Sequence, residues 1–194
     1  MWGPSSSFDA LPQVAAWRHR GARSGFEVAF FEENPWGMRA RGTTTATEDG
    51  VSWVVDYIVQ VDSSWRTRSA RITGRSAAGT RVIEVEADGA GGWRIDGAVA
   101  PHLQGCLDLD LESSAMTNTF PIHRLRPAPE TQVSAPAAYV RADGLSVQRL
   151  EQTYYRTGSR RFRYTAPDLG FTCTMTYDAH GLVEDYPGIA TRVQ

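Results

Sequence analysis

The segment FTCTMTYD (residues 171–178) alternates apolar and polar side chains over most of its length. Phe171, Cys173, Met175 and Tyr177 share one face, and the threonines between them share the other. Successive side chains of a β-strand point to opposite sides, so this two-residue period predicts a strand with one apolar face.

The segment VSWVVDYIVQVD (residues 51–62) shows the same period with a longer run. Its second face is mixed, because Val54 and Ile58 stand there among polar residues. We therefore expect this strand to be partly covered on both sides. Its first face carries Val51, Trp53, Val55, Tyr57, Val59 and Val61.

Further segments alternate in the same way and are separated by short turns rich in Gly, Pro, Asn and Ser. A helical period appears only in short stretches, residues 9–17 and 98–104, which Pro12 and Pro101 keep to a turn or two. The chain is therefore predicted to be all-β and mainly antiparallel. The other expected strands cover residues 25–32, 38–47, 65–74, 80–87, 150–157 and 160–165.

Length and composition indicate one globular domain. The 194 residues are 41% hydrophobic and 22% charged, with a net charge of −2 and no lysine, which argues against a nucleic-acid-binding protein. No secretory signal and no apolar run of about 20 residues is visible, so we expect a cytoplasmic protein without a transmembrane segment. We expect an N-terminal extension at 1–13 and a single domain at 14–194, with a Pro-rich connector at 126–137. The oligomeric state stays open.

The segment LDLDL (residues 107–111) places three leucines on one face and Asp108 and Asp110 on the other. Three interpretations are open. The two aspartates lie on a solvated sheet face, or they accept hydrogen bonds from an arginine in an internal network, or they form a catalytic carboxylate pair about 6.6 Å apart along the strand.

The residues after this segment indicate a turn. Thr117, Asn118 and Thr119 have side chains that bond to nearby backbone. Pro121 cannot donate a ladder hydrogen bond, which predicts a strand edge or a bulge. Arg124 is the expected partner of an aspartate.

The run GCLDLDLESSAMTNTFPIHRL (residues 105–125) resembles the signature of the bacterial "Putative glycolipid-binding" family, an L-D-x-D segment followed by T-N-T-x-P-I-x-R-L. Other pieces agree with it, and the resemblance spans about residue 14 to the C-terminus. These pieces are WRTR (65–68), GGWRIDG (91–97), AAYV (137–140), QTYYR (152–156), RFRYTA (161–166) and DAHGLVEDYPGIATRV (178–193).

The resemblance implies a spiral β-roll, a single antiparallel sheet that curls on itself, with a hydrophobic groove for an amphiphile. Arginine-rich strands on both sides of the connector leave a loose internal duplication open. The motif match carries over Gly97, Pro121, Asp185 and Pro187, along with all candidate ligand-binding residues except Tyr155 and Tyr164. Those candidates are Trp93, Asp96, Asp108, Asp110, Thr117, Asn118, Thr119, Arg124, Tyr155, Tyr164 and Tyr186.

Other chemistries find little support in the sequence. The two cysteines, Cys106 and Cys173, are expected to be free thiols, and the four scattered histidines have no metal-ligand spacing. No nucleophile elbow and no phosphate-binding loop is present, and no cofactor is expected.

We therefore expect a protein, not an enzyme, that binds a glycolipid or another amphiphile in a groove of the curled sheet. The first alternative is a small hydrolase or isomerase that uses Asp108 and Asp110. The second is a protein-interaction scaffold that uses an exposed sheet edge.

Overall fold

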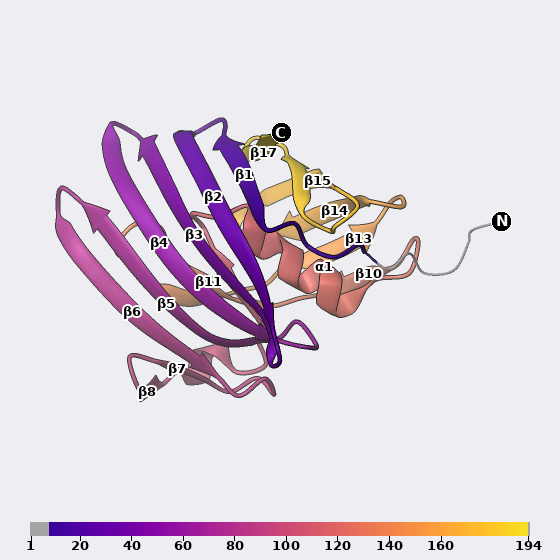
Figure 1. The fold of residues 1–194 in the computed structure, drawn as a ribbon, viewed down its shortest axis with the longest axis horizontal. Helices are drawn as coiled ribbons and strands as arrows, with labels where there is room; N and C mark the ends of the chain where they lie inside the picture. Colours follow the sequence, from indigo (N-terminus) through magenta and orange to yellow (C-terminus); the bar gives the residue numbers. More distant parts are fainter. Residues whose placement is uncertain (1–7, 194) are drawn as a thin grey trace.

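The computed structural model describes residues 8–193, and most of its strands belong to one large sheet (Figure 1). This sheet has 14 strands, and each hydrogen-bonded pair is antiparallel, in the order β10-β13-β14-β15-β16-β17-β1-β2-β3-β4-β5-β6-β7-β8. The strands are β1 (Val14–His19), β2 (Arg23–Asn34), β3 (Gly37–Glu48), β4 (Val51–Asp62), β5 (Thr67–Ser76), β6 (Gly79–Ala87), β7 (Trp93–Ile95), β8 (Ala98–Val99), β10 (Gln132–Ser134), β13 (Thr153–Arg156), β14 (Arg161–Ala166), β15 (Phe171–Tyr177), β16 (Val183–Tyr186) and β17 (Ala190–Val193).

A second sheet of three strands holds the LDLDL segment. Its order is β12-β11-β9, and β9 pairs with β11 in parallel. The helices are short, and none in the described part is long and apolar enough to cross a membrane. These elements are β9 (Asp108–Leu111), β11 (Ala137–Val140), β12 (Val147–Leu150), η1 (Pro101–Leu103), η2 (Met116–Asn118), α1 (Thr119–Leu125) and η3 (Pro167–Leu169).

The all-β prediction is confirmed, and each expected strand overlaps an observed one. The agreement is best for β4, whose bounds match the predicted residues 51–62. Long alternating strands connected by tight turns leave a clear period in the sequence. The second sheet with its parallel pair was not foreseen, because two-residue alternation does not reveal which strands pair. The curl of the sheet and an internal duplication stay predictions.

Two local expectations were wrong. The stretch 9–17 forms no helical turn: residues 9–13 have no regular structure, and Val14–His19 forms β1 between β17 and β2. Pro121 marks no strand edge. It lies in the first turn of α1, where a missing N–H costs no helical hydrogen bond. The outer face of β4 is partly covered, as expected: Val54, Asp56 and Gln60 are half-buried there, although Ile58 is 42% exposed.

The N-terminal and C-terminal parts of the chain meet in the large sheet. Strand β17 pairs with β1, with Ala16 opposite Val193 and His19 opposite Ala190. Ahead of β1, the Asp9 N–H donates to the Ala179 carbonyl, and Phe8 packs on His123. Residues 1–7 of the expected extension lie outside the described residues.

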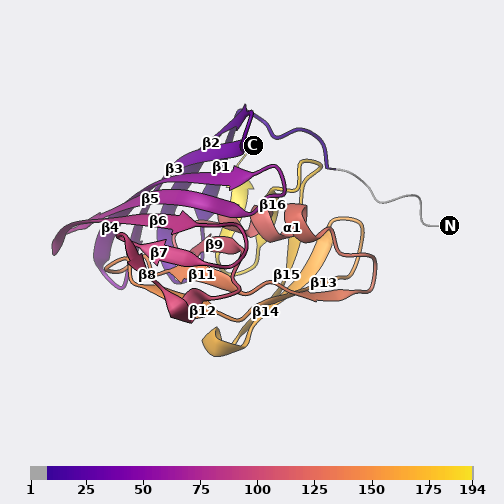
Figure 2. The same cartoon turned by 90° about the horizontal axis from the view of Figure 1, so that it is seen from below.

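The large sheet has two halves in the order of its strands, β10 to β17 and β1 to β8. The chain between β9 and α1 lies between these two halves (Figure 2). Toward β3, the Ser113 carbonyl accepts a hydrogen bond of 2.8 Å from the Thr44 hydroxyl. Toward β13, the Asn118 side-chain oxygen accepts one of 2.9 Å from the Tyr154 hydroxyl. We call residues 108–119 the central segment. Both halves of the sheet hold it in place.

A buried hydrogen bond connects the middle of the large sheet. The Tyr57 hydroxyl on β4 donates to the Glu27 carboxylate on β2 at 2.6 Å, passing over Gly42 on β3. A Cβ atom at Gly42 would collide with the Tyr57 ring and hydroxyl. Because Tyr57 is buried and hydrogen-bonded, it has little room to move.

The substitution Gly42→Ala should therefore lower the free energy of unfolding by about 1–3 kcal/mol, through overpacking against Tyr57. The matched control is Gly158→Ala, whose new Cβ would meet only ordinary contacts, the nearest at 3.6 Å. Urea denaturation of both variants measures the effect. Equal stability of the two would contradict the proposed crowding.

Two buried histidines should make the fold sensitive to acid. Burial lowers the pKa of both His19 and His123 from 6.5 to about 4. Below pH 6.5 the unfolded chain binds protons that the folded chain does not bind, so the free energy of unfolding falls until the pH reaches about 4. Each histidine should remove about 2 kcal/mol between pH 7 and pH 5.

Denaturation of wild type and His123→Phe at both pH values tests this. The phenylalanine keeps a ring beside Phe8 and Trp65, so the variant should lose less stability on acidification than wild type. An identical acid loss in His123→Phe and wild type would refute the assignment.

Candidate functional site

Both aspartates of the LDLDL segment are buried. Strand β9 is buried on both faces. Along its edges, the Leu109 N–H bonds to the Thr67 hydroxyl of β5, and β11 pairs with β9. The interpretation as a solvated sheet face is therefore wrong. Two buried carboxyl groups need an explanation, and the two have different surroundings.

Asp108 forms an ion pair inside the protein. The Arg124 guanidinium donates from Nε to Oδ1 at 2.9 Å and from Nη2 to Oδ2 at 2.5 Å, a bidentate geometry. Helix α1 carries Arg124, so the pair fixes this helix to β9. Both Asp108 oxygens are engaged, and the internal network expected from the sequence is present at this position.

Asp110 has no such partner. Its Oδ1 accepts a hydrogen bond of 2.9 Å from the Thr117 hydroxyl, and among residues 8–193 its Oδ2 accepts none and no arginine pairs with it. Burial, together with the neighbouring carboxylates Asp108 and Glu112, raises the pKa of Asp110 to about 6, although Thr117 lowers it. The group is an acid whose charge is poorly compensated.

Asp110 lines a cavity of about 250 Å³ between the central segment and strands β14 to β17. We call it the Asp110 cavity. Four residues expected from the sequence meet there, namely Asp110, Asn118, Tyr164 and Tyr186. The remaining lining residues are Arg23, Leu111, Glu112, Ser114, Tyr139, Leu169, Phe171 and Ile189.

Aromatic rings form one wall of the Asp110 cavity. Tyr164, Phe171 and Tyr186 lie with ring centres 6.0–6.2 Å apart, in tilted and edge-to-face arrangements. Tyr139 stands beside Asp110 in the parallel pairing of β11 with β9. The cavity thus combines a carboxylate with four aromatic side chains.

Hydrogen bonds to groups behind the cavity hold two of its polar residues in place. The Tyr164 hydroxyl donates to the Gln152 side-chain oxygen at 2.8 Å. The Asn118 side-chain oxygen accepts from Tyr154, which leaves the Asn118 amide nitrogen without an acceptor among residues 8–193. Asn118 is 3% exposed and Asp110 is 7% exposed, so one donor and one acceptor stay available on two largely buried side chains that line a partly open cavity.

The other charged groups of the cavity are already paired. Glu112 accepts from the Ala142 N–H at 2.7 Å and lies 3.4 Å from the Arg141 guanidinium. Arg23 donates to the Glu112 carbonyl at 2.8 Å and lies 3.7 Å from the Glu48 carboxylate. These two groups shape the cavity, and they can form fewer new hydrogen bonds or ion pairs with a ligand than Asp110 and Asn118 can.

The structure places several sequence-predicted residues elsewhere. The Trp93 indole donates to the Cys106 carbonyl in the core, and Asp96 accepts from the Glu84 N–H in a turn. Tyr155 packs against the Arg163 guanidinium outside the cavity. Thr119 is buried, and its hydroxyl has no partner in the described part of the chain.

Sequence reasoning missed several residues of the cavity. Glu112 continues the alternation of Asp108 and Asp110, and that signal could have identified it. Tyr139 enters the site through the parallel pairing of β11 with β9, and Arg23 comes from a distant strand. No local pattern in the sequence marks these two.

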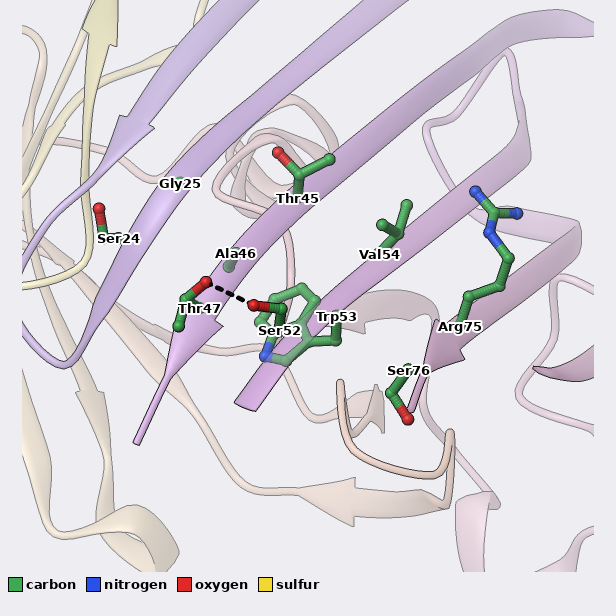
Figure 3. Close-up of a pocket in the computed structure, with 10 residues that line it drawn as sticks. All are labelled: Ser24, Gly25, Thr45, Ala46, Thr47, Ser52, Trp53, Val54, Arg75 and Ser76. Carbon is green, nitrogen blue, oxygen red and sulfur yellow. Dashed lines mark hydrogen bonds between the residues drawn. The ribbon is translucent and has the colours of Figure 1, made fainter. Parts of the chain in front are cut away.

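A second hollow of about 410 Å³ lies at the ends of β2 to β5 (Figure 3). It is wide open and lined mainly by small side chains and backbone. Its hydroxyls Thr47 and Ser52 bond to each other, and Arg75 is paired with Asp56. In contrast to the Asp110 cavity, no aspartate or glutamate is among the described residues that line this hollow.

Metal-binding side chains do not gather in the described chain. Between residues 8 and 193, no three His, Cys, Asp or Glu side chains are arranged to hold a metal ion. Cys106 and Cys173 are both free thiols, and burial raises their pKa to about 11 and about 12. The chemistry of the site therefore comes from carboxylate, amide and phenol groups.

Comparisons with known proteins show similarity over almost the whole chain. The model of a family described as "Putative glycolipid-binding" matches residues 14–192. A solved structure of a DUF1089 family protein from Pseudomonas aeruginosa shares 31% identity, with 91% of this chain and 95% of that chain covered and a TM-score of 0.81. None of the curated proteins searched matches the chain.

A second solved structure supports the fold alone. It is described as a β-barrel-like protein of the domain of unknown function DUF1849 from Brucella abortus. Its identity is 10%, its TM-score is 0.53, and the match covers 96% of both chains. At this identity only the arrangement of strands is comparable.

The two aspartates of β9 should respond oppositely to the same substitution. Asp108→Asn leaves Arg124 buried without its counter-charge, so the free energy of unfolding should fall by about 3–5 kcal/mol. Asp110→Asn removes a poorly compensated buried charge, so the free energy of unfolding at pH 8 should rise by about 1–3 kcal/mol. Denaturant titrations of both variants measure these changes. A loss of stability in both variants would contradict the distinction.

Proposed function

Because the chain belongs to the "Putative glycolipid-binding" family, we propose that it binds the head group of a glycolipid-like amphiphile in the Asp110 cavity. The single observation that carries this proposal is the free donor and acceptor pair of Asn118 and Asp110 in a buried, aromatic-lined cavity. Sugar hydroxyls both donate and accept hydrogen bonds, so they match such a pair.

The size of the cavity limits what it can hold. Cavities for drug-sized ligands occupy about 300–1,000 Å³, and the Asp110 cavity has about 250 Å³. The rest of the interior contains large buried side chains such as Phe120, Phe162 and Leu103. The head group therefore enters the cavity, and the alkyl chain stays outside.

Apolar side chains at the cavity suit this arrangement. Leu169 is 41% exposed and Phe171 and Ile189 are half-buried, and all three line the Asp110 cavity. Apolar surface that stays exposed beside a polar cavity gives the first part of an alkyl chain a place to pack. An amphiphile thus fits better than a free sugar.

A binding role is favoured over catalysis by the Asp108 and Asp110 pair. Both Asp108 oxygens are held by Arg124, and Asp108 does not line the cavity. A carboxylate pair needs both members at the substrate. We therefore retain the proposal of a binding protein and give no role in chemistry to Asp108.

Native mass spectrometry of the protein purified from its own host tests this function, with organic extraction of any bound molecule. We expect a co-purified amphiphile, or binding of one from the total lipid extract of the host. Tyr186→Phe removes a cavity hydroxyl and should weaken binding about 3- to 10-fold, the effect of one hydrogen bond.

The matched control is Tyr155→Phe, the same change outside the cavity, which should leave binding unchanged. NMR titration of the labelled protein with the host lipid extract locates the site. The proposal fails if no lipid of the extract shifts the signals of the Asp110 cavity.

A further inference from the structure

The charge of the Asp110 cavity restricts the head group further, on the premise that the proposed function holds. Two carboxylates, Asp110 and Glu112, line the cavity, and among the described residues that line it Arg23 alone is cationic. Asp110 is more than nine-tenths buried, and its Oδ2 accepts no hydrogen bond from residues 8–193. A buried carboxylate of this kind is costly unless a partner neutralises it.

Within residues 8–193, no arginine forms an ion pair with Asp110 that could neutralise it. Arg23 donates to the Glu112 carbonyl, faces Glu48 and lies 5.5 Å from the Trp53 ring centre. Arg124 is taken up by Asp108. Arg141 pairs with Glu112, so it too is engaged. Burial and the carboxylates of Asp108 and Glu112 both disfavour the charged form of Asp110, which raises its pKa.

The aromatic wall adds a second, independent preference for positive charge. The faces of aromatic rings attract ammonium groups, and several rings around one site bind them better than one ring. Tyr164, Phe171 and Tyr186 lie within 6.2 Å of one another and line the same cavity as Asp110. A ring cluster beside an unpaired carboxylate is suited to an ammonium ion.

We propose that the Asp110 cavity selects a head group that carries a protonated amine, such as an amino sugar. The ammonium donates a charge-assisted hydrogen bond to Oδ2 of Asp110 and lies against the aromatic wall. The Asn118 amide nitrogen donates to a neighbouring hydroxyl of the head group. An anionic head group is excluded, because it would meet Asp110 and Glu112.

The test uses two ring compounds of similar size. It therefore does not require that the natural sugar be known. Cyclohexylammonium carries the charge, and cyclohexanol is its neutral counterpart. NMR titrations of the full chain at pH 7.5 follow the signals of the Asp110 cavity. We expect the ammonium compound to bind wild type at least tenfold more tightly than cyclohexanol.

Two variants separate charge from shape. Asp110→Asn should weaken cyclohexylammonium at least tenfold and leave cyclohexanol unchanged. Tyr186→Leu keeps an apolar side chain but removes a ring face, so it should weaken the ammonium compound about threefold. Tyr155→Phe, outside the cavity, should change neither.

The possible outcomes distinguish this inference from the proposed function. If cyclohexanol binds as tightly as cyclohexylammonium, or if Asp110→Asn keeps ammonium binding, the amine selectivity is wrong. A neutral glycolipid from the host extract that binds this cavity would then leave the proposed function standing. If neither the two compounds nor the host lipids bind the cavity, both proposals fail.

Discussion

The buried carboxylate of Glu27 holds the central segment, on which the site depends. It accepts hydrogen bonds from the Tyr57 hydroxyl, the Ser114 hydroxyl and the Ala115 N–H, so three donors satisfy one charge that is excluded from water. Ser114 and Ala115 stand between Asp110 and Asn118 in the chain. Their attachment to β2 and β4 fixes the turn that brings those two side chains into one cavity.

Further contacts hold the other parts of this segment. The Asp108 and Arg124 pair attaches its start to α1, and the Tyr154 hydroxyl attaches Asn118 to β13. With both ends fixed, little conformational entropy remains to be lost when a ligand binds. The free atoms of Asp110 and Asn118 are thus preorganised.

The sequence predicted the strands well and the site only in part. A long alternation of apolar and polar residues identifies a strand, but it does not always predict which face of the strand is buried. In β2 the large residues Phe26 and Phe30 point outward, and Phe30 is 58% exposed, while Glu27 and Ala29 point inward. A pattern of hydrophobicity would orient this strand the other way. The site depends on that orientation and on the parallel pairing that brings in Tyr139, and neither is a local property.

The difference between Asp108 and Asp110 is the strongest physical argument for a ligand. Both are buried on one strand, two residues apart, so the fold tolerates carboxylates at this depth. Asp108 is neutralised by the chain itself, whereas Asp110 faces a cavity with one oxygen free. A structural aspartate has no reason to keep that arrangement, since an asparagine could accept the same Thr117 hydrogen bond without the cost of charge. A partner from outside the chain would offset that cost, and perturbed acids in cavities commonly mark such sites.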